Sequence, residues 1–594
     1  MSRTPFNIYS FAGMFSAAIL FASGGNHPSF AENATTPGEI STPYPTVTNL
    51  AVQWLIKGDD NLNAMVNVEY RMADEKDWHK AMPLRRVPAG KSADARRPFL
   101  WENKLSGSIF DLRPGTEYEI RLVLKDPDGG SAEKTVRAST RTVPKPAPDA
   151  VVKKVNPRTF PDSALTARPG DILLLTPGYY GEFTMQRDGE PGRPIVIRAD
   201  RAHEVINSTF DRVDLGNRRH VILDGVTVYG SVDLVGAREV TVRRCTVNAK
   251  YGIIAKSPPG CTNCYIADNV VTYVMPWVGF GMGCCLDNNA GAACVGEGIQ
   301  ITGPGNVICY NRVKGYRDCI SHMEDLPVHE QICNDIYNND IYVGADDGIE
   351  ADFAQGNCRI MRNRLTNCFI ALSSQPGLGG PTYFIRNVMY NIINCPYKLS
   401  RSSKGDVVLH NTVVKVGDGF LVSHNPSLAL FRNNLMIGGE GGDTRRGGMF
   451  GVFGSGPGYA VNFPRANETC DADYNGVGAH GMPFEGVFGR AHFKSLGELK
   501  NLTTEKHAVQ VDMSVFKEGA AFPNPAIPER EPADLRLREG SAAVDAGLVI
   551  PNVNDNFTGK GPDLGAYELG QELPHYGPRP AGMDEETMWR ERNR

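Results

Sequence analysis

Five carboxylates near the middle of the chain are its densest group of residues that could do chemistry. Asp346 and Asp347 are followed closely by Glu350 and Asp352, and Asp318 lies upstream of them. If the fold brings these acids together, their charges repel one another unless a proton or a cation relieves them. Ca²⁺ accepts several hard oxygen ligands in a flexible geometry. Such a patch of acids would therefore suit Ca²⁺.

Residues of other types could act on a substrate beside these acids. Lys398 is a candidate base, and Arg401, which follows it, is a candidate ligand for an anionic sugar. His322 is a candidate helper at the substrate, and Trp277 could stack on a sugar ring. All four residues also have an ordinary structural interpretation. His322 would suit a core position, Lys398 a solvated face, Arg401 a surface or turn contact, and Trp277 the core of a loop.

A repeat supplies the elements that would position these residues. A triplet of turn residue, any residue and aliphatic residue recurs along the chain, mostly at intervals of 24 residues. Its first members are Asn269, Asn311, Asn339, Asn363, Asn387, Asn411 and Asn433, with Cys245 in the same place before them. One interval holds three short strands and three turns, and no single coil buries its apolar face alone. The period predicts an all-β, right-handed parallel β-helix over residues 150–570.

Two properties suit Asn to the repeated position. It tolerates the left-handed backbone conformation of a sharp turn, and its amide can bond the Asn of the next coil to form a ladder. The longer interval between Asn269 and Asn311 indicates an insertion, about residues 273–296, that contains Trp277. Three cysteines lie in the same insertion: Cys284, Cys285 and Cys294.

The repeat also predicts a column of side chains that face solvent. An aliphatic or aromatic residue points inward in each coil, so the next residue points outward by strand alternation. The expected outward column is Gln300, Ser321, Glu350, Ala371, Lys398 and Leu421, with Asp352, Ser373 and Ser400 two residues further along. Lys398 then lies two coils beyond Glu350, roughly 10 Å away at the usual strand spacing. One coil, containing Cys368 to Ala371, separates them.

These motifs resemble those of a known enzyme family. Asp346-Asp347-Gly348-Ile349-Glu350 resembles the Asp-Asp-Gly-x-Asp calcium motif of family 9 polysaccharide lyases, with Glu350 in place of the last Asp. Asp318 matches the ligand that those enzymes take from the preceding coil, and Pro396-Tyr397-Lys398-Leu399 is similar to the segment that carries their catalytic lysine. Family members place that lysine closer in sequence to the acids. The resemblance implies a pectin-lyase-like solenoid.

The same resemblance implies Ca²⁺-assisted β-elimination on a uronic-acid polysaccharide, or the related uronate epimerisation. Lys398 would remove the proton beside the sugar carboxylate, and Asp318, Asp346, Asp347 and Glu350 would hold the ion. A cation on that carboxylate stabilises the enolate-like charge that develops. The base must be neutral, and a lysine that is partly desolvated or among other cations titrates lower than in water.

Two other function classes fit the same pattern. An inverting glycoside hydrolase would use two carboxylates about 6.5–9.5 Å apart, such as Asp318 or Asp347 with Glu350. A non-catalytic glycan-binding or surface protein would use the acids only as a calcium staple, since a fold does not specify a function.

A second folding unit is expected before the β-helix. Residues 45–142 alternate apolar and polar positions, and residues 112–120 resemble the tyrosine corner of fibronectin type III domains, with Trp54 as the core aromatic. This β-sandwich could bind glycan or act as a spacer. Residues 143–149 are predicted to be a Pro-rich linker, and residues 571–594 a C-terminal tail after the last coil.

The remaining features place the protein outside the cytoplasm. Residues 1–31 are typical of a signal peptide cleaved near Ala31, so the chain is expected to be secreted or periplasmic. No other segment is apolar enough to span a membrane. The 13 cysteines would meet an oxidising compartment, and Cys261-x-x-Cys264 suggests a turn disulfide or buried thiols. A net charge of −5 without a basic run argues against nucleic acid. The resemblance implies an acidic polysaccharide as the partner, and the chain is expected to be a monomer.

Overall fold

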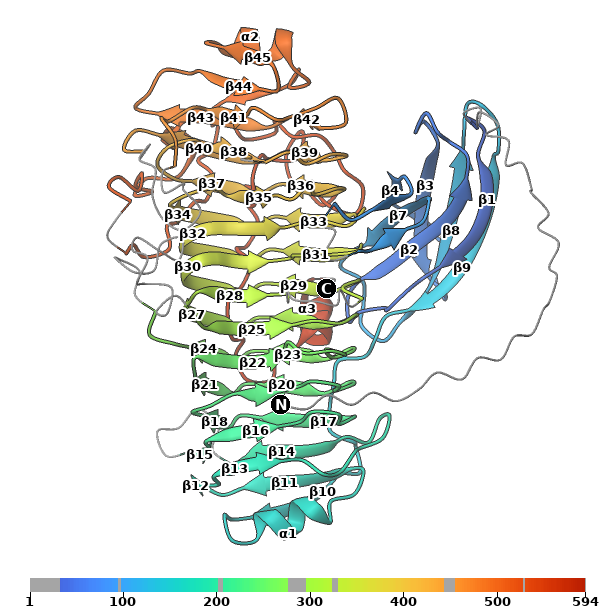
Figure 1. Ribbon diagram of the computed structural model, residues 1–594, viewed down its shortest axis with the longest axis vertical. Helices are drawn as coiled ribbons and strands as arrows, with labels where there is room; N and C mark the ends of the chain where they lie inside the picture. Colours follow the sequence, from blue (N-terminus) through green and yellow to red (C-terminus); the bar gives the residue numbers. More distant parts are fainter. Residues whose placement is uncertain are drawn as a thin grey trace, which may run out of the picture.

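The computed structural model describes residues 32–93, 98–200, 207–275, 295–322, 330–422, 424–442, 455–526 and 529–592. The signal peptide expected at residues 1–31 lies outside the described residues. Trp277 and the cysteines Cys284, Cys285 and Cys294 also lie outside them. Most of the described chain forms a stack of coils, and an antiparallel sheet lies beside that stack (Figure 1).

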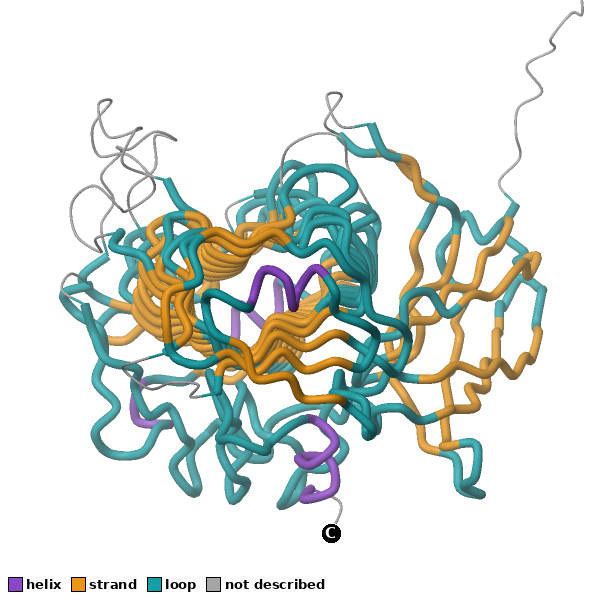
Figure 2. The backbone as a smooth tube through the Cα atoms, turned by 90° about the horizontal axis from the view of Figure 1, so that it is seen from below, coloured by secondary structure: helices purple, strands orange, loops and turns teal. Residues whose placement is uncertain are grey.

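The stack of coils is a parallel β-helix, as the repeat predicts. One face is a 13-stranded sheet, and the strands of the other two faces join around a corner into a 20-stranded sheet. Each strand pairs in parallel with the corresponding strand of the next coil, as Ile172 of one coil pairs with Val196 of the next. Seen along the stack in Figure 2, the strands of successive coils lie over one another.

The 13-stranded sheet contains β10 (Val151–Val155), β11 (Asp171–Leu175), β14 (Ile195–Ala199), β17 (Val221–Asp224), β20 (Thr241–Arg243), β23 (Tyr265–Ala267), β26 (Val307–Cys309), β29 (Asp335–Tyr337), β31 (Cys358–Met361), β33 (Thr382–Ile385), β36 (Asp406–Leu409), β39 (Leu430–Arg432) and β42 (Asp471–Asp473). The 20-stranded sheet contains β12 (Gly178–Tyr179), β13 (Glu182–Thr184), β15 (Ser208–Phe210), β16 (Arg212–Asp214), β18 (Thr227–Val228), β19 (Val232–Asp233), β21 (Thr246–Asn248), β22 (Tyr251–Ala255), β24 (Val270–Thr272), β25 (Glu297–Ile301), β27 (Arg312–Tyr316), β28 (Asp318–Ser321), β30 (Asp340–Glu350), β32 (Arg364–Ser374), β34 (Val388–Ile392), β35 (Tyr397–Leu399), β37 (Thr412–Val414), β40 (Leu435–Gly439), β43 (Gly476–His480) and β46 (Val509–Gln510). A smaller sheet at the C-terminal end contains β38 (Phe420–Leu421), β41 (Val461–Phe463), β44 (Gly486–Phe488) and β45 (Ala491–Phe493).

A ladder of buried asparagine amides fixes how the coils stack. The side-chain amide of each ladder residue donates to the side-chain oxygen of the next at 2.9–3.0 Å. The members are Asn269, Asn311, Asn339, Asn363, Asn387, Asn411, Asn434 and Asn475. The predicted ladder is confirmed, but its seventh member is Asn434 instead of Asn433, and it continues to Asn475.

The left-handed turn residue differs from the one expected. The residue immediately before each ladder Asn has a positive φ, for example Asp268 (60°), Arg362 (51°) and Asn433 (58°), and the ladder residues themselves do not. The prediction that one Asn serves both purposes is therefore wrong. The left-handed turn residue and the ladder residue occupy separate positions. The side-chain amide of the ladder residue must lie along the stack, whereas the residue before it turns the chain. This separation explains the one-residue error at Asn433.

Short helices close or flank the stack. α1 (Phe160–Leu165) lies at its N-terminal end, where Phe160 packs against Tyr180, Phe183 and Phe210. α2 (Leu496–Leu502) lies at the other end and α3 (Glu585–Arg592) at its side (Figure 1). Among the described residues no helix has both the length and the apolar character needed to cross a membrane.

The N-terminal part forms an antiparallel, sandwich-like sheet. Its strands, in spatial order, are β1 (Thr36–Ser41), β2 (Leu50–Lys57), β7 (Lys104–Ile109), β4 (His79–Val87), β3 (Met65–Met72), β8 (Glu117–Lys125) and β9 (Ala132–Ser139), with a side hairpin of β5 (Gly90–Lys91) and β6 (Leu100–Trp101). Trp54 is fully buried in its core, as expected. The Tyr118 hydroxyl accepts a hydrogen bond from the Arg113 backbone N–H at 2.8 Å, which forms the predicted tyrosine corner. The sheet already includes β1, upstream of residue 45.

The sandwich is docked on the 13-stranded face of the β-helix. Asn49 Nδ2 donates to Asp335 Oδ2 at 2.7 Å, and Arg362 binds Asp111 at 2.7 Å. The Ser108 backbone N–H donates to the Tyr383 hydroxyl at 3.1 Å. Such polar pairing fixes the orientation of one unit on the other, so the sandwich is held firmly against the coils.

The predicted linker and tail also lie against the β-helix. Pro144 O accepts from Arg243 Nη1 at 3.0 Å, and Lys145 Nζ lies 3.0 Å from Glu586 Oε2 in α3. Glu585 of the same helix is buried, and its Oε1 accepts hydrogen bonds from Tyr265 and Tyr337 at 2.9 and 2.8 Å. Residues 143–149 and 571–592 therefore join the two units instead of extending freely.

All ten cysteines among the described residues are buried, and none of them forms a disulfide, including Cys261 and Cys264. Of the two interpretations of Cys261-x-x-Cys264, the structure shows buried thiols.

We expect Asn363→Ala to destabilise the protein by roughly 2 kcal/mol or more, because it leaves buried partners without hydrogen bonds. Asn363 Nδ2 donates to Ile336 O and Asn387 Oδ1, and Asn363 Oδ1 accepts from Asn339. Thermal and urea unfolding would measure the loss. The control is Asn425→Ala, at an exposed site, which should leave stability unchanged. Equal stability of the two variants would contradict a structural role for the ladder.

The end of the ladder predicts a pH effect. Asn475 Nδ2 donates to Glu505 Oε1 at 2.7 Å, and burial raises the pKa of Glu505 from 4.5 to about 8. The folded state therefore keeps a proton that the unfolded state releases above pH 4.5, so stability from this group falls as pH rises towards 8. Glu505→Gln keeps the acceptor and stays neutral. We expect the variant to exceed the wild type in unfolding free energy by more than about 1 kcal/mol at pH 9 and to lose this advantage at pH 5. A constant difference across that range would contradict the assignment.

Candidate functional site

The coils bring the predicted acids and Lys398 onto one ribbon of the 20-stranded sheet. Gln300, Ser321, Glu350, Ser373 and Lys398 pair in register through β25, β28, β30, β32 and β35. Lys398 therefore lies two coils beyond Glu350, as expected. The predicted register holds for this column, but the prediction that the column faces solvent is wrong: Ser321, Glu350 and Ser373 are buried, and the Lys398 side chain is only 12% exposed.

One coil was assigned to the wrong register. Ser373, and not Ala371, lies between Glu350 and Lys398, while Ala371 is fully buried in the core. Cys368 pairs with Gly344 and not with Asp347, because β32 runs around the corner without interruption and places two more residues before the column. At the next coil Val422 pairs with Tyr397, so Leu421 is also shifted out of the expected column.

A β-bulge in β30 creates the acidic pair. The register of β30 on β32 shifts between Gly344 and Asp347, so the bulge inserts one extra residue at the corner. The Asp346 N–H bonds Arg317 O at 2.9 Å, and the Asp347 N–H bonds Asp318 Oδ1 at 2.9 Å instead of a neighbouring carbonyl. A Cβ on the following Gly348 would lie 2.6 Å from a side-chain carbon of the core. The bulge and the glycine together let both acids approach Asp318.

Three carboxylates meet at one point of the ribbon. One oxygen each of Asp318, Asp347 and Glu350 lies within 4.8 Å of the others, and all three residues are buried. Asp347 Oδ1 is buried and accepts no hydrogen bond within the described chain. Burial, followed by the charges of neighbouring acids, raises the pKa of Asp318 and of Glu350 well above the ordinary value. A cluster of this kind is stabilised by protons or by a cation.

Glu297 belongs to the same cluster, although sequence reasoning did not place it there. It pairs with Asp318 in register, and its Oε2 accepts from Ser321 Oγ at 2.9 Å. Burial raises the pKa of Glu297 to about 7. Arg317 Nε lies 3.1 Å from Asp318 Oδ2 and 3.7 Å from Asp346 Oδ2, so it neutralises one side of the cluster. The repeat itself could have identified Glu297, which precedes Gln300 as Asp347 precedes Glu350.

Lys398 reaches across the intervening coil. Its Nζ contacts Asp347 Oδ2 and lies 3.6 Å from Glu350 Oε1, and its side chain is 12% exposed. Burial favours the neutral amine, but Asp347 and Glu350 outweigh that effect and raise the pKa of Lys398 well above the ordinary value. The expectation of a lowered pKa assumed desolvation or neighbouring cations, whereas carboxylates surround this ammonium. The extra coil is therefore no obstacle to contact.

The other predicted residues fall into different places. His322 is buried, its Nε2 lies 3.3 Å from Asn334 Nδ2, and burial lowers its pKa to about 4, so it is neutral. This environment matches the core interpretation of His322 better than a substrate contact. Arg401 is half-buried in the turn after β35, with a φ of 51°. Asp352 accepts from Ser373 Oγ at 2.7 Å, and Trp277 lies outside the described residues.

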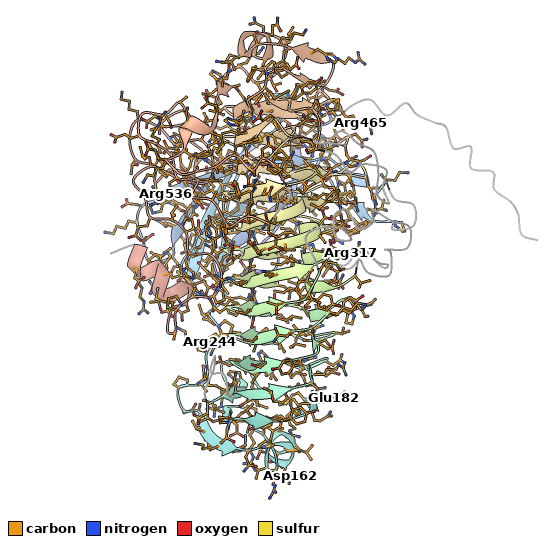
Figure 3. The ribbon with its side chains drawn as sticks, turned by 90° about the vertical axis from the view of Figure 1, so that its left-hand side faces the viewer. Asp162, Glu182, Arg244, Arg317, Arg465 and Arg536 are labelled. Carbon is orange, nitrogen blue, oxygen red and sulfur yellow. The ribbon has the colours of Figure 1, made fainter. Side chains whose placement is uncertain are left out.

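A histidine that sequence reasoning missed lies on the C-terminal side of Lys398. Burial, together with the positive charges of Arg465 and Lys398, lowers the pKa of the half-buried His424. Arg465 lies further along the stack than Arg317, on the same edge of the molecule (Figure 3). The acidic cluster therefore lies on the N-terminal side of Lys398, and Arg465 adds a positive charge near His424 on the other side.

Comparisons with known proteins add no identity to this geometry. A scan against protein-family models found none that matches this chain. A search of curated proteins found no similar sequence. The resemblance to family 9 lyases therefore depends on the motif residues alone, and the function must be argued from the arrangement of Asp318, Asp347, Glu350 and Lys398.

Proposed function

We propose that this chain is a secreted enzyme that cleaves a uronic-acid polysaccharide by Ca²⁺-dependent β-elimination. One observation carries the proposal: three buried carboxylates converge within 4.8 Å of one another, and Lys398 contacts two of them. This is the pairing of a cation site and a base that such a reaction requires.

The donor set fits a hard divalent cation. Asp318, Asp347 and Glu350 offer only oxygen ligands, which Ca²⁺ prefers. Asp347 Oδ1 accepts no hydrogen bond in the described chain, so a ligand atom is already available. Asp346 lies next to the cluster, because Arg317 contacts both Asp318 and Asp346, and its carboxylate could supply a further ligand. When bound, the cation supplies positive charge that stabilises the enolate-like transition state of the substrate.

Lys398 is the proposed base. Lys398 lies at the rim of the cluster and is partly exposed. When a sugar carboxylate points at the acids, the proton on the carbon beside that carboxylate would lie close to Lys398. The charges of Asp347 and Glu350 hold a proton on Lys398. Sharing these two carboxylates with a cation weakens that hold and moves Lys398 towards the neutral form that can accept a proton. Arg465 adds positive charge on the C-terminal side, beside a His424 whose lowered pKa favours the neutral imidazole, and an acidic chain would extend in that direction.

The geometry gives less support to the inverting hydrolase. Its two carboxylates stand about 6.5–9.5 Å apart so that a water fits between them. Asp318 or Asp347 with Glu350 is closer than that, at 4.8 Å or less between ligand oxygens. A binding protein without activity remains the second candidate, since a calcium staple would need the acids but not Lys398.

We further propose that the N-terminal sandwich is a fibronectin type III-like domain that serves as a fixed spacer. The hydrogen bond between Tyr118 and Arg113 at the corner and the buried Trp54 support this assignment. Its polar docking on the coils supports a fixed, and not a flexible, spacer.

The proposal is tested by incubating the protein with polygalacturonate, alginate and neutral glycans, with and without EDTA. Absorbance near 235 nm reports the unsaturated product of elimination, and reducing ends report all cleavage. We expect absorbance on at least one polyuronate and its loss on chelation. Reducing ends without absorbance would establish the hydrolase instead, and no product on any polymer would favour the binding protein.

Glu350→Ala should remove most of the thermal stabilisation that added Ca²⁺ gives, because one of three converging ligands is lost. Differential scanning fluorimetry with and without Ca²⁺ measures this. Asp162→Ala is the control, since Asp162 is exposed at the far end of the molecule (Figure 3). An unchanged Ca²⁺ response in Glu350→Ala would remove Glu350 from the site.

Lys398→Ala should lower kcat by about 10²-fold or more, as expected for loss of a general base, while the stabilisation by Ca²⁺ persists. Lys506→Ala, at an exposed lysine, is the matched control. Wild-type kcat in Lys398→Ala would assign proton removal to another group.

A further inference from the structure

Three tyrosines are the only ones exposed among the described residues, and all lie along one corner of the β-helix. Tyr179 is 63% exposed, Tyr229 61% and Tyr251 36%. Tyr179 ends β12, Tyr229 follows β18 and Tyr251 begins β22, so each lies where the chain turns between the same two faces. We call these three residues the tyrosine edge. The Tyr179 hydroxyl donates to Asp211, but the three rings stay exposed, and their alignment along one corner suits a ligand that follows the stack of coils.

The tyrosine edge leads directly to the acidic cluster. Tyr251 pairs in register with Glu297, which pairs with Asp318. Tyr251 therefore lies two coils from Asp318, about 10 Å at the usual strand spacing. Tyr229 is one coil further away, and Tyr179 two coils beyond that. Glu182, beside Tyr179, and Arg317, beside Asp318, lie along the same edge in Figure 3.

Positive charge is concentrated at the part of the edge nearest the cluster. Lys250 Nζ lies 5.6 Å and Lys256 Nζ 4.8 Å from the centre of the Tyr251 ring. Both lysines are exposed, and neither forms an ion pair with another residue in the part of the chain that the structure describes. Two ammonium groups close to one exposed ring suit a ligand that combines an apolar face with carboxylates.

We propose that the tyrosine edge, with Lys250 and Lys256, binds the stretch of an acidic polysaccharide that extends from the acidic cluster towards the N-terminal end of the β-helix. A sugar residue in an extended chain advances by close to one coil spacing. Tyr229 and Tyr251 lie on successive coils, so the C–H faces of neighbouring sugars can rest on these two rings, as aromatic side chains allow. Tyr179, two coils beyond Tyr229, can hold a sugar further along the same chain. The lysines bind uronate carboxylates close to Tyr251. This inference rests on the proposed function and adds the path of the substrate.

The test is affinity gel electrophoresis in polygalacturonate, alginate and neutral dextran, with EDTA present so that no polymer is cleaved. We expect retardation of the wild type by at least one polyuronate and not by dextran. The triple variant Tyr179→Ala/Tyr229→Ala/Tyr251→Ala should bind that polymer about tenfold or more weakly. The triple Phe variant keeps the rings and should bind as the wild type does. Lys250→Gln/Lys256→Gln should weaken binding and reduce its salt dependence.

The control removes three exposed apolar side chains elsewhere, in Leu165→Ala/Leu502→Ala/Leu548→Ala, and should leave retardation unchanged. Unchanged melting temperatures would show that every variant is folded. Equal retardation of the triple Ala variant and the wild type overturns the proposed path, and so does a wild type that no polyuronate retards. Unsaturated product in the absorbance assay would leave the proposed function standing in either case, so the two failures are distinguishable.

Discussion

The coil-to-coil register is the constraint on which every other feature of this molecule depends. Acids separated by dozens of residues along the chain meet only because each coil places its strands and turns at the same positions as the coil before it. Parallel strand pairing alone would tolerate a slip, but a slip would leave the buried amides of the ladder, Asn363 and its neighbours, without partners. The ladder therefore does more than stabilise the core. It fixes the distances within the acidic cluster.

The acidic cluster lies where this regularity is interrupted. At β30 one extra residue enters the corner, and the ladder of backbone hydrogen bonds gives way to a bond from the Asp347 N–H to the Asp318 carboxylate. A perfectly regular coil would direct neighbouring side chains to opposite faces. The bulge allows Asp346 and Asp347 to contribute to one surface, and Gly348 lets the strand resume its path without a clash. Local irregularity on a rigid frame is the usual way in which a repetitive fold acquires a specific site.

Much of this could be predicted from the sequence, and the failures have identifiable causes. The spacing of Asn residues specified the parallel coils, and the pairing of Ser321 with Glu350 followed from it. The placement of Ala371 failed because motif matching assumes equal coils, whereas β32 continues around the corner. The pKa of Lys398 could not be predicted, because its sign depends on how near Asp347 approaches, and that distance is a tertiary property. Glu297 was accessible to the same reasoning and was missed.

The burial of Glu585 has a consequence for the order in which this molecule can be completed. Its carboxylate is enclosed by Tyr265 and Tyr337 and paired with Arg579, so a site on early coils is filled by a residue made some 300 positions later. Until that helix is in place, the hydroxyls of Tyr265 and Tyr337 lack Glu585 as their hydrogen-bond partner. Lys145 likewise lacks its contact with Glu586. Contacts of such sequence separation form late, because a long loop must first be closed. The linker that carries Lys145 therefore gains its contact with α3 only when the last stretch of chain is in place.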